Sequence, residues 1–511
     1  MSALRDGSSP HPQIRRARTA TPAMAAMGIT AGWVALVAVV LLAGCATTGG
    51  LAPQARVRSV ASLGASQTLS GAKVGGVWPS QDWWTAFGDP QLDRLIEEGL
   101  AGSPSLKEAE ARTRLALAAA RVADAARLPQ VGLAGASTRE LFPGHYLIPP
   151  PYAGTWSTAN ELSLSLGYSL DFWGKYRSAY EQSLDASRAA ALDAEAARVA
   201  LSTAIAHAYV AMERAYLERG VEQTLLAERT QIYSLTRERS AAGIDSMVDV
   251  KQARSALPDA RERITQLDET IGLSRDALAA LIGAGPDRGR ALERPQLVAL
   301  PAPALPTRLP AELLGRRPDI LALRWRIESA RHGIASAKAD FYPDVNLAAL
   351  AGFAALGTGA LFTAANREIG VGPALSLPIF YGGRLRGNLA GRDAEYDIAV
   401  AQYNQALSDA LRDVADQLVS LRSIAGQRTE LGDGLATAQD AYDLALQRYR
   451  GGVGNYLQVL ATHEALLAQR QLDVELRARA WDVSIDLVGA LGGGYVPTRA
   501  DEPPAASGPR R

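Results

Sequence analysis

The sequence predicts a mainly α-helical protein with a small β part, built from a duplicated helix-strand-strand-helix-helix repeat. Three observations predict this fold. Long segments contain neither glycine nor proline, short segments alternate apolar with small residues, and both kinds of segment recur about 200 positions later. Together they indicate one repeated structural unit rather than two unrelated domains.

The strands are predicted from alternation. Residues 369–380 place apolar side chains on one face and mostly small ones on the other, and residues 162–172 do the same 207 positions earlier (369 − 162). About ten residues with this pattern are typical of a transmembrane β-strand. One such strand alone would favour a half-buried strand of a soluble sheet, and it is the rest of the chain that favours the membrane. The residues expected to face lipid are Leu162, Leu164, Leu166, Leu375, Leu377 and Ile379.

The duplication is also visible in the segments before the strands. Pro104 and Pro129 recur 214 positions later as Pro318 and Pro343. We therefore expect a first repeat over residues 83–300 and a second over residues 301–495. The first has strands at 131–138 and 162–172 and a helical hairpin with its tip near 243–247; the second has strands at 345–355 and 369–380 and a tip near 452–456.

The helices are too long for an ordinary globule, since residues 175–219 hold neither glycine nor proline. Apolar residues recur every seven positions along the returning helix of each hairpin, which predicts left-handed supercoiling against neighbouring helices. A plain coiled-coil rod would show the same pattern, and only the strands argue against it. The two series are Val250, Leu257, Ile264, Ile271 and Leu278, and Leu460, Leu467, Val474, Trp481 and Val488.

The N-terminus carries a targeting signal. Residues 1–44 have a basic flank followed by an uncharged, apolar run, as in a signal peptide. Cys45, the only cysteine, directly follows Leu-Ala-Gly, a sequence that resembles the bacterial lipoprotein box. That resemblance implies acylation of Cys45 and, because residue 46 is Ala, the outer membrane. We expect residues 45–82 to be a lipid-anchored flexible tether and residues 496–511 a disordered tail.

Composition excludes several functions. Lys plus Arg and Asp plus Glu both total 53, so no basic surface for nucleic acid is expected. The five histidines lie far apart, and no phosphate-binding loop or nucleophile motif occurs. We therefore expect no enzyme activity, metal or cofactor. A periplasmic coiled-coil adaptor or scaffold lipoprotein is the competing class, and the repeated strands with Cys45 argue against it.

Four amphipathic strands cannot form a membrane structure alone. An open sheet edge in lipid leaves backbone groups unpaired at a cost of several kcal/mol each, and the smallest membrane barrels have about eight strands. Several copies of the chain must therefore combine their strands.

Motifs in both repeats resemble one family. They are the pattern Trp84-x-x-Phe87-x-Asp89-Pro90-x-Leu92, the Leu-Pro-Gln and Tyr-Pro-Asp segments before the strands, Leu170-Asp-Phe-Trp-Gly174, and Leu377-Pro-Ile-Phe-x-Gly-Gly383. These motifs, in order over residues 83–495, resemble the TolC-like outer-membrane efflux channels, closest to the OprM- or NodT-like lipoprotein branch.

The resemblance implies a homotrimer with a shared twelve-stranded barrel in the outer membrane. A long coiled-coil barrel of helices would extend from it into the periplasm. Such a channel is a passive exit duct for drugs or other small solutes, driven by an inner-membrane pump through a periplasmic adaptor. The outer-membrane component of a type I protein secretion system shares this fold, and the sequence leaves that alternative open.

By the resemblance, the two turns are the periplasmic tips. Gly243 and Gly452 suit the positive φ that ends a helix. The resemblance implies adaptor contacts at these glycines and at Met247 and Tyr456.

The resemblance also implies a resting gate. Its latch would join Asp249 of the first turn to Tyr449 of the second. Some relatives carry two aspartates at the pore constriction, where this chain has Gln458 and Ala461, and Gly454 replaces an arginine. An acidic filter at the entrance is therefore not expected.

Overall fold

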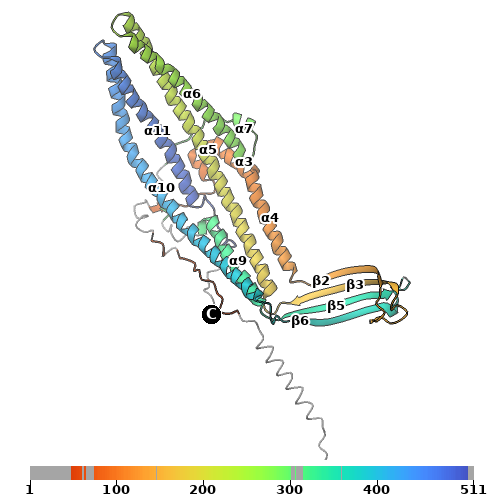
Figure 1. The fold of residues 1–511 in the computed structure, drawn as a ribbon. Coiled ribbons are helices and arrows are strands. Elements are labelled where there is room, and N and C mark those ends of the chain that lie inside the picture. The colour runs from red at the N-terminus through yellow and green to blue at the C-terminus, as the bar shows by residue number, and fades with distance from the viewer. Residues whose placement is uncertain are drawn as a thin grey trace, which may run out of the picture.

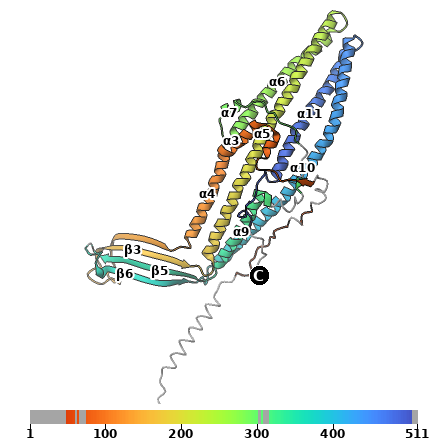
Figure 2. The ribbon, with the colours of Figure 1, turned by 180° about the vertical axis from the view of Figure 1, so that it is seen from behind.

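The computed structural model describes residues 48–59, 62–64, 74–145, 147–300, 305–306, 315–357 and 359–503. The predicted signal peptide (1–44) and Cys45 lie outside the described residues. The described chain is a long helical body with a sheet projecting from one end (Figures 1 and 2). Four helices reach the opposite end: α5 (Lys175–Ala241), α6 (Met247–Leu281), α10 (Arg384–Arg450) and α11 (Tyr456–Ala490).

Equal helix lengths confirm the duplication. Helices α5 and α10 each have 67 residues, and α6 and α11 each have 35. Helices α4 (Pro104–Ala125) and α9 (Pro318–Ala339) each have 22. Each repeat therefore contains one 22-residue helix, two strands and one long helical hairpin.

The predicted seven-residue stripe forms much of the packed face of each hairpin. Val250, Leu257, Ile271 and Leu278 are buried on α6, and Trp481 is buried on α11. Since a seven-residue spacing keeps one face of a helix turned toward its neighbour, this burial is the expected basis of long, straight packing. Within the described residues no helix is long and apolar enough to cross a membrane.

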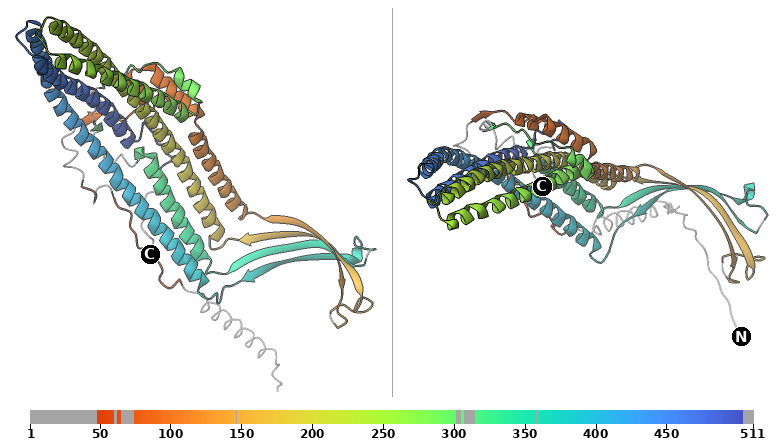
Figure 3. Two further views of the ribbon diagram at one scale, coloured as in Figure 1. Left: turned by 45° about the horizontal axis from the view of Figure 1, so that its top comes forward. Right: turned by 90° about the horizontal axis from the view of Figure 1, so that it is seen from above.

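The sheet has four antiparallel strands in the order β2-β3-β5-β6 (Figure 3). They are β2 (Gln130–Leu141), β3 (Trp156–Leu170), β5 (Asp344–Leu356) and β6 (Arg367–Ser376). Strands β3 and β5 come from different repeats and pair at the centre. The outer edges of β2 and β6 have no strand beside them within the described chain.

The register separates apolar from small residues. Leu164 lies opposite Leu133 and Ala351 on one face, and Ser163 lies opposite Ala134 and Gly352 on the other. Directly opposed residues point to the same side of a sheet. The alternation predicted for the strands therefore extends across the sheet.

Three details of the strand prediction are wrong: the bounds of β3, which spans Trp156–Leu170 rather than 162–172, the end of β6, and the repeat spacing. Strand β6 ends at Ser376, so Leu377 and Ile379 lie beyond it. Ser376 pairs with Asp344, the first residue of β5, and no strand continues opposite the residues after it. The repeat spacing of β3 and β6 is 209 rather than 207, because Gly167 and Ser376 hold equivalent positions in their hairpins (376 − 167). A shift of two leaves each side chain on the same face.

The main core lies at the waist of the helical body, where η2 (Trp83–Phe87) and α3 (Pro90–Gly102) pack on α5, α6 and α11. Asp89 caps α3, whose first residue is Pro90, and accepts a 2.6 Å bond from the Tyr209 hydroxyl. This bond fixes the short helix to the long one. The remaining small elements are β1 (Val74–Gly76), α7 (Pro286–Arg290), β4 (Leu305–Pro306) and η3 (Ala364–Asn366).

The described parts of the predicted flexible tether (45–82) and disordered tail (496–511) contact the helical body. Residues 51–58 of the predicted tether lie along α10, where Asp397 and Asn404 bind their backbone. In the predicted tail, the carbonyl of Asp501 accepts a 2.9 Å bond from the Trp325 indole. Side chains of the helical body thus hold backbone groups of both segments.

Candidate functional site at the helical tips

The two tips share one backbone design. The glycines Gly243 and Gly452 have φ of 78° and 81° and follow the ends of α5 and α10, as predicted. Ser246 and Asn455 then cap α6 and α11 by accepting backbone N–H bonds. Each tip is therefore a left-handed helix end followed directly by a helix start.

The predicted pair of Asp249 and Tyr449 is wrong for this chain. One carboxylate oxygen of Asp249 accepts bonds from the backbone N–H of Ser246 at 2.9 Å and from its hydroxyl at 2.6 Å. An acid at the third position of a helix completes such a capping box with its own helix start. Asp249 is therefore engaged in its own turn.

Tyr449 instead pairs with Asp245, four residues earlier in the first turn. Its hydroxyl donates to Asp245 Oδ2 at 2.5 Å and lies 2.8 Å from Thr236 Oγ1. The Tyr449 side chain is fully buried. A phenol of the second hairpin thus binds a carboxylate of the first.

Arg239, near the end of α5, completes this cluster. Its guanidinium binds both oxygens of Asp245, at 2.8 Å and 3.1 Å, and donates to the backbone carbonyl of Tyr449 at 2.7 Å. It also lies 4.3 Å from the centre of the Tyr449 ring. The side chains of Arg239 and Asp245 are each only 9% exposed. We call Arg239, Asp245 and Tyr449 the tip cluster.

The electrostatics keep the tip cluster in one protonation state. Hydrogen bonding from Arg239 lowers the pKa of Asp245, with a further contribution from Tyr449. Burial, and then the bond to Asp245, raise the pKa of Tyr449 to about 12. At neutral pH the cluster therefore holds a carboxylate, a phenol and a guanidinium.

A second set of polar contacts joins the hairpins farther from the tip. Glu228 on α5 accepts a 2.8 Å bond from the buried His463 and a 3.0 Å bond from Arg470, both on α11. These bonds lower the pKa of Glu228 against the effect of burial, which alone would raise it. Arg229 pairs with Glu464 at 2.9 Å. Sequence reasoning missed these residues because they pair across more than 200 positions.

The other predicted tip residues divide into exposed and buried positions. Met247 is 62% exposed, whereas Tyr456, its equivalent on α11, is only 4% exposed and packs in the core beneath the tip. The burial of Tyr456 argues against the predicted adaptor contact there. Gln458 and Ala461 are exposed in the single chain.

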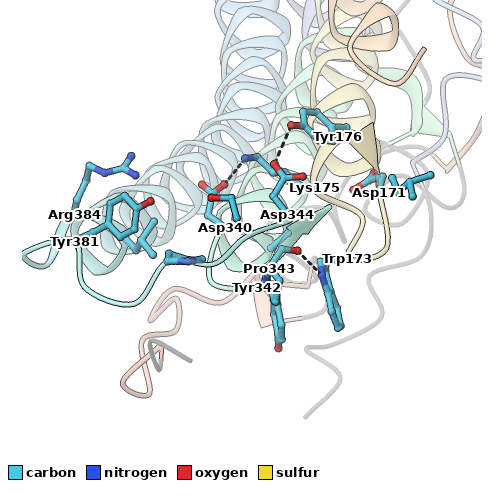
Figure 4. Close-up of a pocket in the computed structure, with 15 residues that line it drawn as sticks. Asp171, Trp173, Lys175, Tyr176, Asp340, Tyr342, Pro343, Asp344, Tyr381 and Arg384 are labelled. Carbon is cyan, nitrogen blue, oxygen red and sulfur yellow. Dashed lines mark hydrogen bonds and ion pairs between the residues drawn. The ribbon is translucent and has the colours of Figure 1, made fainter. Parts of the chain in front are cut away.

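A separate cleft of about 350 Å³ lies where the sheet meets the helices (Figure 4). Trp173 stacks on Tyr342 at 4.6 Å and donates to the Pro343 carbonyl, while Lys175 pairs with Asp340 at 2.9 Å. These groups bind one another and join the start of α5 to the end of α9. The residues that line the cleft therefore connect the two repeats. The described residues contain no group of His, Cys, Asp and Glu suited to a metal ion.

Comparison with known proteins identifies the fold. A family model for outer membrane efflux proteins matches residues 95–284 and 309–493. The fusaric acid resistance protein FusA of Burkholderia cepacia is 41% identical over 360 residues, which cover 69% of this chain and 67% of that protein. The multidrug resistance outer membrane protein MdtP of Escherichia coli K12 is 31% identical over 82% of this chain and 87% of its own length.

Solved structures agree with the sequence comparison. The outer membrane protein VceC of Vibrio cholerae superposes with a TM-score of 0.77 at 38% identity, covering 82% of this chain and all of that protein. The outer-membrane channel OprN superposes with a TM-score of 0.76 at 26% identity, over 88% of this chain and 98% of that protein. The chain belongs to the outer membrane efflux protein family.

Proposed function

We propose that three copies of this outer-membrane efflux channel close their sheets into one twelve-stranded barrel, and that their helices form a tube reaching into the periplasm. The observation that carries the proposal is the open sheet. Its two edge strands are unpaired within the described chain, and one face carries exposed apolar side chains on every strand. Closure with other copies removes both edges.

The exposed face suits lipid. Leu133, Ile369, Val371 and Leu375 are between 65% and 77% exposed in the single chain. The opposite face carries mainly Gly, Ala and Ser, which suit the wall of a water-filled lumen. Leu164→Arg should therefore impair assembly by about 2–4 kcal/mol near the bilayer centre, whereas Ser163→Arg should assemble. Equal assembly defects would contradict this orientation.

The internal repeat indicates how copies meet. Helix α9 packs against both α5 and α10, whereas its equivalent α4 packs mainly on α5. Leu115 and Val122, one heptad apart on α4, are 71% and 73% exposed. Helix α10 of the next copy would cover this face if the copies follow the internal symmetry.

The same symmetry gives a register between copies. Gly167 on β3 pairs with Ala348 on β5. Their repeat equivalents are Ser376, 209 positions later, and Ala134, 214 positions earlier. Ser376 of one copy should therefore lie opposite Ala134 of the next. Oxidation of an Ala134→Cys, Ser376→Cys double variant should give covalent trimers.

The control for that experiment moves one cysteine by two positions. Ala374→Cys keeps the same face of β6 but should lie opposite another residue of the neighbouring strand. It should cross-link to Ala134→Cys less well. Cross-linking that is equal for both pairs, or absent for both in assembled protein, would contradict the proposed closure.

The far ends of the helices suit a partner protein. Both tips expose the same apolar pattern, since Ile244 and Val248 of the first recur as Val453 and Leu457 of the second, each between 60% and 73% exposed. Three copies would present six such tips. We assign these four residues, together with Met247, to contact with a periplasmic adaptor, through which an inner-membrane pump supplies the energy.

The transported class is small solutes. Relatives are named for resistance to fusaric acid, for multidrug resistance and for toluene efflux. Cells lacking the chromosomal gene should become sensitive to such compounds, and the wild-type gene should restore resistance. The matched control is an Ile244→Asp, Val453→Asp variant, which should assemble without restoring resistance. Unchanged sensitivity after deletion would contradict the role.

The lipid anchor is part of the proposal. Acylation of Cys45 would hold the mature N-terminus at the membrane by burying acyl chains. Cys45→Ser should abolish incorporation of labelled palmitate, while the strands still carry the protein into the membrane. Labelling that persists in this variant would contradict the assignment.

We assign the resting gate to the tip cluster. A tube open at both ends would leak, and the small residues of the sheet cannot narrow it. The contacts of Arg239 and Tyr449 with Asp245 tie the two hairpins together. Three copies of these contacts would keep the open state a minor population until a partner binds the tips.

A further inference from the structure

An extended N-terminal segment lies beside α10, and we call residues 48–59 the strap (Figure 1). Its side chains alternate: Leu51, Pro53, Ala55 and Val57 are half-buried, and the residues between them are exposed. Such alternation is the pattern of an extended chain lying on a surface. Leu51, Ala55 and Val57 pack on core clusters that include α10.

Two side chains of α10 hold the backbone of the strap. The Asp397 carboxylate accepts from the backbone N–H groups of Gln54 and Ala55, the shorter bond being 2.8 Å. The Asn404 amide accepts from the backbone N–H of Arg58 at 2.9 Å and donates to the carbonyl of Arg56 at 3.0 Å. These contacts bind an extended peptide backbone rather than particular side chains.

The contacts also give the path of the strap. Leu51 packs on the cluster that contains Leu389, and Ala55 bonds to Asp397. Eight residues of α10, from 389 to 397, rise about 12 Å, and four extended residues of the strap, from 51 to 55, span about 13 Å. The strap and the helix therefore cover similar distances between these two contacts. The strap therefore passes over the turn of α10 between Leu389 and Asp397.

Asp393 lies on that turn and is buried without a donor. It is 6% exposed, and neither oxygen of its carboxyl group has a hydrogen-bond partner. Its position four residues from both Leu389 and Asp397 places it on the face of α10 that lies between α9, which carries Lys338, and the strap. A buried carboxylate without donors is unfavourable, whereas a protonated carboxyl group is far less so.

We propose that the strap covers Asp393 in a proton-dependent way. The strap is seated, that is, bound to α10, when the Asp393 carboxyl group is protonated, and it detaches when that group ionises. An ionised Asp393 needs water, and lifting of the strap admits it. Residues 48–59, which follow Cys45 in the sequence, would thus bind reversibly to α10.

The neighbouring charges set the sign of the effect. Burial is the main cause that raises the pKa of Asp393; the charge of Asp397 on α10 raises it further, and Lys338 at the end of α9 lowers it. The charged residues of the strap, Arg56 and Arg58, lie farther along, at Asn404. Because the pKa is raised in the seated state, seating is favoured at low pH and is lost as the pH rises through that raised pKa.

Trypsin offers a direct test, because Arg56 and Arg58 are cleavage sites whose backbone the seated strap holds. Full-length protein in membranes is digested at several pH values from about pH 4, near the ordinary carboxyl pKa, to about pH 8, and cleavage at these arginines is followed by N-terminal sequencing. Asp393→Asn is measured in parallel, so the ratio of the two rates cancels the pH dependence of the protease. We expect the wild type to be cleaved severalfold faster than Asp393→Asn at the higher pH, and at a similar rate at the lower pH.

Two further variants keep the test decisive if Asp393→Asn folds poorly. Lys338→Met removes the opposing charge from an exposed position and should slow cleavage in the pH range where Asp393 ionises, because the Asp393 carboxyl group then stays protonated to higher pH. Asp397→Ala removes the backbone acceptor and should speed cleavage at every pH. A rate ratio of wild type to Asp393→Asn that does not change with pH, or an Asp397→Ala strap that is cleaved no faster than the wild type, would overturn the proposal.

Discussion

The turn that joins α5 to α6 and the turn that joins α10 to α11 have the same backbone but different chemistry. In both, a glycine of positive φ ends the first helix, and a Ser or Asn side chain caps the second. Every equivalent position is 209 residues apart. The duplication therefore preserved the shape of the tip.

The side chains that bind the tips together occur where the repeats diverged. Asp245 of the first turn corresponds to Gly454 of the second, and Tyr449 of the second corresponds to Ser240 of the first. A Cβ atom at Gly454 would lie 2.9 Å from the backbone nitrogen of Tyr449, so a larger residue there would displace the chain. Each turn thus supplies one half of a pair that neither repeat contains alone.

The largest effect is expected from Arg239→Ala. This change leaves the buried Asp245 carboxylate without its bidentate partner, and removal of one member of a buried ion pair costs about 3–5 kcal/mol. The matched control is Arg448→Ala, since Arg448 is the exposed equivalent of Arg239 on α10. Single-channel conductance should rise in Arg239→Ala and stay at the wild-type level in Arg448→Ala.

An equal response of these two arginine variants would contradict the asymmetry between the turns. Trimer yield in detergent is measured alongside, because the closed state is compared only between assembled channels. A low yield for Arg239→Ala alone would show that the cluster is needed for assembly rather than for closure.

Acid should open the channel through the same cluster. The pKa of Asp245 is lowered chiefly by its bond with Arg239, so its stabilising contribution is present above the ordinary carboxylate range and is lost as the pH falls through the lowered value. Conductance of the wild type should therefore increase only at strongly acidic pH. The Asp245→Asn channel should conduct more at neutral pH and lose this acid response; an unchanged acid response would contradict the assignment.

The smallest effects should be equal in the two turns. Gly243→Ala and Gly452→Ala each force a side chain into the left-handed region, which costs about 1–2 kcal/mol. Neither glycine has other atoms within 4 Å of an added Cβ. The two variants should therefore lower the thermal midpoint by similar amounts. A clearly larger loss at one turn would show that the backbones are not equivalent.

The sequence predicted the repeated parts of the fold because their patterns are local. Helix lengths follow from the absence of breakers, and strand faces follow from alternation, so an error of two in the repeat spacing left every side chain on its correct face. The end of β6 was less predictable. The residues after Ser376 continue the predicted alternation of apolar and mostly small side chains, but no strand lies opposite them in a single chain.

The partner of Tyr449 could not be read from the sequence. Asp249 and Asp245 both lie in the first turn, and the family pattern favoured Asp249. The structure shows Asp249 capping its own helix, which leaves Asp245 to pair with Arg239 and Tyr449. The strap was missed for a different reason. Its alternation is short, and the residues that hold it, Asp397 and Asn404, are more than 300 positions away.

The central claim is that Asp245 and Tyr449 form one closing contact between the repeats. A double-mutant cycle of Asp245→Asn and Tyr449→Phe, read out as the open fraction of single channels, tests it most directly. Each single change weakens the same bond, which is worth about 1.5–3 kcal/mol when one partner is charged, so the double variant should open little more than either single variant. Asp249→Ala, which loses only a helix cap, should leave the open fraction unchanged. Additive effects of the two changes, or opening by Asp249→Ala alone, would contradict the account.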